Sequence, residues 1–312
     1  MVKTVAEVAL PVDEVLTIRK NRLQPAGRKK GKRISIVTGI HGDELEGQYV
    51  AYELQRRIRE NMDHLQGTVD VYPAMNPLGI DSITRGIPAF DLDLNRLFPG
   101  NMDGNMTEYL AAKIIDDVKG SDVVVDIHAS NIYLTEVPQI RINELHQEWL
   151  LPLAEQCNMD FIWVHGAATV LEATFAYSLN SIGTPVLVVE MGVGMRISQN
   201  YGQQMVDGIF SLMKYLGIWN GETVPPKKPM ISTDWQDVYY LNAVTGGLFV
   251  PRVKHSQYLA KGELIGEIVD PLRGEVLDRV TAPEEGLLFT LRDYPVVEEG
   301  SLLGRILRKE VC

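Results

Sequence analysis

Two side chains with metal-binding chemistry follow an apolar run near the start of the chain. His41 and Glu44 lie in Gly39-Ile40-His41-Gly42-Asp43-Glu44-Leu45-Glu46-Gly47, one residue after Ile34-Ser35-Ile36-Val37. An imidazole and a carboxylate three positions apart, where a strand passes into a helix, can converge on one metal ion. The glycines on both sides allow the backbone to turn and to approach a ligand closely. A second histidine from elsewhere would complete a His₂Glu set, which in catalytic zinc sites leaves one position open for water.

The second histidine ends another predicted strand. His128 closes Val123-Val124-Val125-Asp126-Ile127-His128, and small residues follow it. In open α/β sheets, ligands bind beyond the carboxyl ends of the strands, so we expect His41 and His128 to meet there. Asp126 lies on the same side of the strand as His128 and can orient it. The remaining histidines lack such a setting and are expected to be structural: His64, His146, His165 and His255.

Further groups could act on a substrate. A third predicted strand ends at Glu190, a carboxylate suited to act as a general base that takes a proton from water and passes it to a leaving amine. Asn95 and Arg96 offer an amide and a guanidinium fork for a carboxylate. Arg85 can polarise a carbonyl and stabilise an oxyanion. Standing alone, each arginine would be explained better by a surface ion pair.

The elements that must position these groups alternate as in α/β proteins. Strands are predicted at residues 34–38, 69–72, 123–127, 161–164 and 186–189. They are apolar throughout, which indicates burial on both faces of a sheet. Helices are predicted at residues 44–60, 107–118, 145–156 and 199–216.

The pattern changes after a proline-rich linker at residues 220–229. Short apolar pieces separated by glycines predict a small antiparallel sandwich or barrel. We therefore predict a catalytic domain at residues 1–222 and a mainly β domain at 223–312. The second domain is similar to biotinyl/lipoyl-type folds, but its predicted hairpin tip at 271–274 carries an arginine and no lysine, so a carrier role is not expected. We expect this domain to pack against the catalytic one.

Composition limits the function classes. The chain has 312 residues, of which 45% are apolar and 23% charged, and a net charge of −11, which argues against a nucleic-acid or anionic-membrane partner. A basic cluster at residues 28–33 is expected to be a solvated turn. Cys157 and Cys312 are far apart and imply no disulfide framework. No segment has signal-peptide character or an apolar run of membrane-spanning length, so a cytoplasmic protein is expected.

Taken in order, these motifs resemble those of the succinylglutamate desuccinylase/aspartoacylase family, relatives of the zinc carboxypeptidases. The resemblance covers nearly the whole chain and rests on four segments: Gly39–Gly47 with its GxHGxE pattern, Asp93-Leu94-Asn95-Arg96, Asp126-Ile127-His128 and Val189-Glu190-Met191-Gly192. It implies an α/β fold, with a mixed-sheet α/β/α catalytic domain and a smaller C-terminal β-domain.

The resemblance also implies roles for individual residues. His41, Glu44 and His128 would bind one zinc ion per chain, and Glu190 would be the catalytic base. Arg85 would stabilise the oxyanion. Asn95 and Arg96 would hold the α-carboxylate of an N-acyl amino acid.

One departure concerns the substrate. Aspartoacylases have an arginine about ten residues before the catalytic glutamate, which holds the second carboxylate of their substrate. Residues 176–182 contain no arginine here, so N-acetylaspartate is not the expected substrate. Arg141 or Arg196 could supply a replacement cation, and we predict Arg141 to be substrate-binding.

The sequence thus predicts a zinc-dependent amidohydrolase acting on an N-acyl amino acid or a similar small amide. A metallocarboxypeptidase acting on short peptides is an alternative, although such enzymes normally lack the C-terminal β-domain. A non-catalytic binding relative would be expected to have lost a ligand or the base, and a structural zinc site is usually rich in cysteine. The expected binding partner is a small molecule, and the sequence is compatible with a homo-oligomer.

Overall fold

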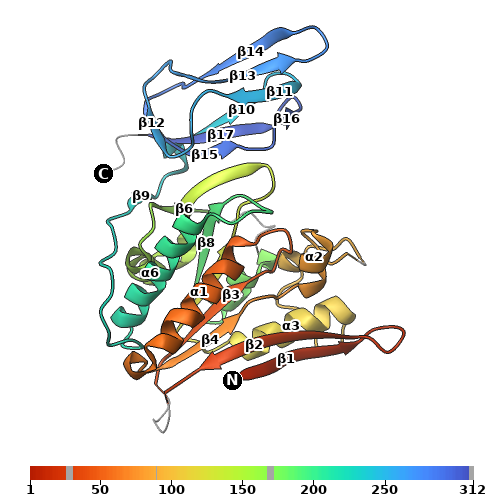
Figure 1. Cartoon of the computed structure of the whole chain (residues 1–312), viewed down its shortest axis with the longest axis vertical. Coiled ribbons are helices and arrows are strands. Elements are labelled where there is room, and N and C mark those ends of the chain that lie inside the picture. The colour runs from red at the N-terminus through yellow and green to blue at the C-terminus, as the bar shows by residue number, and fades with distance from the viewer. Residues whose placement is uncertain (26–30, 89, 167–171, 309–312) are drawn as a thin grey trace.

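A large mixed sheet lies between two layers of helices, and a smaller sheet packs beyond one of its ends (Figure 1). The computed structural model describes residues 1–25, 31–88, 90–166 and 172–308. This architecture confirms the predicted α/β class with an added β-rich segment. The basic residues Arg28 to Lys30 and Cys312 lie outside the described residues.

The central strands of the large sheet run in one direction. Its strands before residue 200 are β1 (Val2–Ala9), β2 (Val15–Leu23), β3 (Arg33–Thr38), β4 (Thr68–Tyr72), β5 (Val123–His128), β6 (Leu134–Asn143), β7 (Phe161–His165) and β8 (Val186–Gly192). β4, β3, β5 and β8 are neighbours in that order and are parallel, whereas β6 pairs antiparallel with β8. The parallel strands therefore bring their carboxyl ends to one edge, which confirms the arrangement expected from the strand pattern.

Helices cover both faces of this sheet. The α-helices are α1 (Glu46–Glu60), α2 (Pro77–Ser82), α3 (Met106–Val118), α4 (Gln147–Ala154), α5 (Phe175–Ser181) and α6 (Gln199–Tyr215). The apolar faces of α1, α4 and α6 share one core with strand residues such as Ile36, Val125 and Leu187. Those of α3 and α5 share a second core with Val124 and Val186. Burial of neighbouring residues on opposite faces explains why these strands are apolar throughout.

Short 3₁₀ helices lie in the connections between these elements. They are η1 (Met62–His64), η2 (Leu94–Arg96), η3 (Glu144–His146), η4 (Glu155–Cys157) and η6 (Trp235–Asp237). The helix predicted at residues 145–156 is divided into η3, α4 and η4, with Pro152 inside α4. Helix α1 begins at Glu46, so Glu44 stands in the turn before the helix and not within it.

Strand β6 was not predicted from the sequence. It contains Glu136, Pro138 and Arg141, and its pairing with β8 shifts register between Glu136 and Gln139. Charged residues and a proline interrupt the apolar pattern by which central strands are identified. The two charged residues, Glu136 and Arg141, make ion pairs at the site and with the C-terminal segment.

The C-terminal segment is all-β, as predicted. Strands β9 (Met230–Ser232), β10 (Val238–Asn242), β12 (Gln257–Leu259), β15 (Gly286–Arg292) and β17 (Leu302–Arg308) extend the large sheet. The second sheet contains β11 (Gly247–Pro251), β13 (Leu264–Asp270), β14 (Glu275–Thr281) and β16 (Val296–Val297). Leu241, Phe249, Ile268 and Ile306 belong to the core shared by these strands. Because β15 pairs with β6, the sheet is continuous with the preceding segment. No helix among the described residues is long and apolar enough to span a membrane.

A buried ion cluster joins strands β2 and β4. The carboxylate of Asp70 is fully buried and accepts hydrogen bonds from Arg22 Nε at 2.7 Å and from Lys20 Nζ at 3.2 Å. Burial by itself raises the pKa of Asp70, but the Arg22 hydrogen bond and the Lys20 charge outweigh burial and hold the pKa below its ordinary value. Lys20 also contacts Asp117 of α3 at 2.5 Å, so the cluster ties the sheet to a helix.

We expect Asp70→Asn to lower the free energy of unfolding by about 3 kcal/mol, because Arg22 loses its carboxylate partner and Lys20 keeps Asp117 as its only ion-pair partner. Since the pKa of Asp70 is lower in the folded state, the carboxylate stabilises the fold at neutral pH. This stabilisation is lost as the pH falls through the folded pKa. Urea unfolding followed by circular dichroism at neutral and acidic pH measures both effects. The control is Asp116→Asn, which removes an exposed pair with Lys119; an equal loss in both variants would contradict the prediction.

Candidate active site

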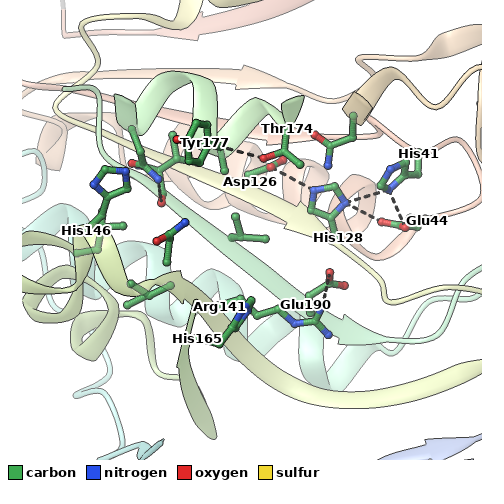
Figure 2. A pocket seen from close by; sticks show the side chains of 18 of the residues that line it. His41, Glu44, Asp126, His128, Arg141, His146, His165, Thr174, Tyr177 and Glu190 are labelled. Atoms are coloured by element: carbon green, nitrogen blue, oxygen red, sulfur yellow. Dashed lines mark hydrogen bonds and ion pairs between the residues drawn. The ribbon is translucent and has the colours of Figure 1, made fainter. Parts of the chain in front are cut away.

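All the residues predicted to take part in function line one pocket of about 240 Å³. These are His41, Glu44, Arg85, Asn95, Arg96, His128, Arg141 and Glu190. In Figure 2, His41, Glu44 and His128 lie together on one side of the pocket, and His146 lies on the opposite side. The pocket therefore extends well beyond the group of candidate metal ligands.

Three strand ends supply the central groups. His41 follows β3, His128 is the last residue of β5, and Glu190 on β8 is the direct parallel-pairing partner of His128. The turn that carries His41 packs against α2 so closely that a Cβ at Gly42 would lie 2.0 Å from the carbonyl carbon of Gly79. A glycine is therefore required inside the motif for a steric reason.

His41, Glu44 and His128 face a common point. Glu44 Oε1 lies 2.8 Å from His41 Nδ1, and Glu44 Oε2 lies 2.9 Å from His128 Nδ1. The two Nδ1 atoms are 3.1 Å apart, and one ligand atom from each of the three residues lies within 4.8 Å of the others. All three side chains are buried. This is a donor set that could hold one metal ion.

The outward nitrogen of each imidazole is held by a carboxylate. His41 Nε2 is 3.1 Å from Asp93 Oδ1, and His128 Nε2 is 3.1 Å from Asp126 Oδ2. A carboxylate accepts, so each Nε2–H can donate to it, and each Nδ1 faces the common point, where a neutral ring would present its lone pair. Metal-binding histidines are commonly fixed by carboxylates in this way. Asp126 is thus in contact with His128, and its orienting role stays a prediction.

The carboxylate of Glu44 contacts four other groups of the site: His41, His128, Arg85 and the backbone of Ala129. Arg85 Nη1 donates to its Oε1 at 2.9 Å, and the backbone N–H of Ala129 donates to its Oε2 at 3.0 Å. Burial opposes its ionisation, but the charges and hydrogen bonds of His41 and His128 outweigh burial and hold the pKa of Glu44 well below its ordinary value. The carboxylate is therefore ionised at neutral pH.

Glu190 lies beside this group in a different environment. Its Oε2 accepts a hydrogen bond from the backbone N–H of Ser130 at 2.8 Å, and its Oε1 is 3.4 Å from Arg141 Nη1. Burial raises the pKa of Glu190, although the charges of Arg141 and His128 act in the opposite direction. A carboxylate with a raised pKa is better suited to accept and return a proton than an ordinary one.

Arg141 belongs to a buried network that reaches the C-terminal segment. Its Nη2 donates to Glu136 Oε2 at 2.8 Å, and Glu136 is fully buried. Arg305 on β17 donates to Glu136 Oε1 at 2.7 Å, and Thr290 on β15 donates to the same atom at 3.1 Å. The guanidinium of Arg141 is thus shared between Glu136 and Glu190.

The remaining predicted residues take different positions. Asn95 Oδ1 accepts a hydrogen bond from the backbone N–H of Phe175 at 2.9 Å, which ties η2 to the start of α5. Arg96 is exposed, and its Nη1 donates to the backbone oxygen of Asn95 at 2.8 Å. Arg196 is exposed beside Asp293 and is not among the pocket-lining residues, so it does not supply a cation there.

Sequence reasoning missed several residues of the pocket. His146 and His165 were expected to be structural, yet both line the pocket. A usable signal existed for His165, which follows a predicted strand, but β6 beside it was not recognised. Asn180 also lines the pocket and stands ten residues before Glu190; its side chain is bonded to the backbone N–H of Val186 at 2.8 Å.

Comparisons with a family model and with a curated protein agree on the family of this chain. A model of the succinylglutamate desuccinylase/aspartoacylase catalytic domain matches residues 30–216. An N-alpha-acetyl-L-2,4-diaminobutyric acid deacetylase from Halomonas elongata is 27% identical over 281 residues, which cover 86% of this chain and 79% of that protein.

Solved structures share the fold. A succinylglutamate desuccinylase/aspartoacylase structure from Rhodobacter sphaeroides has a TM-score of 0.81 at 23% identity, and the match covers 98% of this chain and 95% of that one. The product-bound ectoine utilization protein from Ruegeria pomeroyi has a TM-score of 0.79 at 20% identity, covering 95% of this chain and 90% of that one. With the domain match spanning more than half of its length, this chain belongs to the succinylglutamate desuccinylase/aspartoacylase family.

Proposed function

We propose that this protein is a zinc-dependent amidohydrolase that removes the acyl group from an N-acyl amino acid. The observation that carries the proposal is the convergence of His41, Glu44 and His128 beside a separate, partly buried carboxylate, Glu190. The relative from Halomonas elongata is named as a deacetylase of an N-acetylated amino acid, which supports this reaction type.

The donor set fits zinc. Two imidazoles and one carboxylate are the protein ligands of many catalytic zinc sites, and the fixed Nε2 atoms leave both Nδ1 lone pairs free for a metal. His41, Glu44 and His128 would hold the ion. When bound, zinc lowers the pKa of a coordinated water to about 7 and polarises a carbonyl as a Lewis acid.

The protein groups supply proton transfer and charge stabilisation. Glu190, held by Ser130 and Arg141, takes a proton from the attacking water and delivers it to the amine as the amide bond breaks. Arg85 carries a positive charge beside Glu44 and stabilises negative charge on the former carbonyl oxygen. The products are a carboxylic acid and a free amino acid.

Substrate orientation is assigned to Asn95 and Arg96. Both line the pocket, and the exposed guanidinium of Arg96 makes one hydrogen bond to a neutral backbone oxygen. A carboxylate would be a stronger partner for it. We assign the α-carboxylate of the substrate to this pair.

The first prediction concerns the metal. The purified protein is expected to contain about one zinc ion per chain, and His128→Ala is expected to lose it. Asp126→Asn should weaken zinc binding by roughly 10- to 100-fold, because His128 loses the carboxylate that orients it. Metal analysis and competition with a chelator measure both. His64→Ala is the control because His64 lies outside the pocket; less than about half a zinc ion per wild-type chain would refute the assignment.

The second prediction concerns the base. Glu190→Gln should keep zinc but lower kcat by roughly 100- to 10,000-fold, because an amide cannot accept the proton from water. Steady-state rates with a panel of N-acyl amino acids give the comparison. Glu7→Gln changes an exposed glutamate on β1 and should leave the rate unchanged. Full activity in the Glu190 variant would exclude this residue as the base.

The third prediction concerns the α-carboxylate. Arg96→Ala should raise KM for N-acyl amino acids roughly 10- to 100-fold, because a charge-assisted hydrogen bond is lost. The matched substrate is the corresponding N-acyl amino acid amide, which lacks the carboxylate and should respond little to the substitution. Equal effects on both substrates would show that Arg96 does not read the carboxylate.

Short peptides test the alternative function. A metallocarboxypeptidase would use the same metal ligands and the same base, so the variants above do not separate the two. The direct comparison is kcat/KM for N-acyl amino acids against dipeptides and tripeptides. Peptides cleaved much faster than N-acyl amino acids would overturn the deacylase proposal.

A further inference from the structure

We propose that the far end of the pocket receives the side chain of the substrate's amino acid and selects a large uncharged one, aliphatic or aromatic. We call this end the distal pocket. Its walls are formed by Ile142, His146, Leu150, Ala176, Tyr177 and Val186. The proposal rests on the deacylase function proposed above and adds the substrate class to it.

The distal pocket continues directly from the reacting centre along β8. Val186, Val188 and Glu190 all line the pocket, and alternate residues of a strand share one face. Val188 therefore lies about 7 Å from Glu190 along the strand, and Val186 lies about as far again. A side chain that begins near Glu190 meets these valines first.

The carboxylate-binding pair directs the substrate towards this end. Asn95 is bonded to the first residue of α5, and Ala176 and Tyr177 of the same helix line the distal pocket. With the α-carboxylate at Asn95 and Arg96 and the amide nitrogen at Glu190, the side chain is the remaining substituent of the α-carbon, and we assign it to the space between α5 and β8. Figure 2 shows Tyr177 between His128 and His146 in this direction.

Most of the six side chains that define the distal pocket are apolar, and neutral polar residues of the same pocket complete its lining: Asn143, His165, Thr174 and Asn180. Ile142, Leu150, Ala176 and Val186 are all buried. An apolar side chain of four or more carbons would bury its surface here at a gain of about 0.8 kcal/mol per CH₂ group. An alanine side chain would leave this space unfilled.

Charged groups are confined to the other end. Among the described pocket residues, the carboxylates are Glu44, Asp126 and Glu190, and all three make their hydrogen bonds at the histidine end, where Asp126 Oδ1 is left without a partner. A substrate ammonium group in the distal pocket would be buried without a carboxylate, which is costly. The undescribed segment 167–171, Ala-Ala-Thr-Val-Leu, has no ionisable side chain in its sequence.

A substrate carboxylate would also lack a free cation. Arg141 is the pocket-lining arginine on β6, but Glu136 and Glu190 already share its guanidinium. Burial lowers the pKa of His146 and of His165, so both are neutral at physiological pH. Asn180, ten residues before Glu190, has its amide bonded to the backbone of Val186.

A buried polar atom without a partner lies at the end of the distal pocket. His146 Nε2 is buried and has no hydrogen-bond partner among the described residues. The ring lies edge-on to Trp149, with centroids 5.4 Å apart. This atom can pair with a hydroxyl or a ring N–H, so tyrosine and tryptophan side chains are accepted beside leucine and phenylalanine.

The experiment measures kcat/KM of the zinc-loaded full-length protein on matched substrates. The panel contains the N-acetyl and N-succinyl derivatives of alanine, leucine, phenylalanine, tyrosine, aspartate and 2,4-diaminobutyrate. We expect the large uncharged side chains to exceed alanine, aspartate and diaminobutyrate by at least about tenfold. A preference for aspartate or diaminobutyrate would overturn the proposal, and so would an alanine derivative hydrolysed as fast as the leucine one.

A substitution tests where the side chain binds. Ala176→Leu fills the distal pocket and should lower the ratio of kcat/KM for N-acetylphenylalanine to that for N-acetylalanine at least about tenfold. Ala260→Leu, at an exposed position of the C-terminal segment, is the control and should leave the ratio unchanged. Zinc content and circular dichroism establish that both variants are folded. An unchanged ratio in folded Ala176→Leu would overturn the assignment of this subsite.

Failure of the underlying function gives a different result. If the zinc-loaded protein hydrolyses no member of the panel, the deacylase proposal falls, and the substrate class falls with it. If it hydrolyses the panel with a charged preference, only the substrate class falls. The two proposals are therefore distinguishable in one set of measurements.

Discussion

The organisation of the site depends on one buried carboxylate. Glu44 is 3% exposed, and its two oxygens contact His41, His128, Arg85 and the backbone N–H of Ala129. An ionised group at this depth is tolerated only when several donors or a cation surround it. The surrounding positive charges keep Glu44 ionised, and the same need for compensation makes the site a strong position for a divalent cation.

Backbone geometry brings the partners of Glu44 together. The parallel pairing of β3, β5 and β8 aligns three strand ends, and the register sets His128 directly beside Glu190. Close packing holds the turn that carries Glu44: a Cβ at Gly42 would meet the backbone of Gly79, and one at Gly47 would meet Thr38 at 2.1 Å. A rigid turn of this kind keeps metal ligands in position before the ion binds.

The C-terminal segment contributes to the same site from a distance. Arg305 and Thr290 hold Glu136, Glu136 holds Arg141, and Arg141 contacts Glu190. The pairing of β15 with β6 makes this possible, because it sets Thr290 opposite Glu136. Each oxygen of the buried Glu136 carboxylate thereby has an arginine partner, which offsets the cost of burying its charge. The β-rich segment therefore does more than cover the catalytic part: it completes the surroundings of the candidate base.

The sequence by itself determined the elements with a regular apolar pattern and the motifs at their ends. It predicted β3, β5 and β8, and it identified His41, Glu44, His128 and Glu190, because strand ends and local spacing are properties of short segments. Tertiary structure decided what depends on distant pairing. Strand β6, with its proline and charges, is stabilised by partners far along the chain, and so its Arg141 could not be placed. The surroundings of His146 and the neutral character of the distal pocket likewise arise only where β8, α4 and α5 meet.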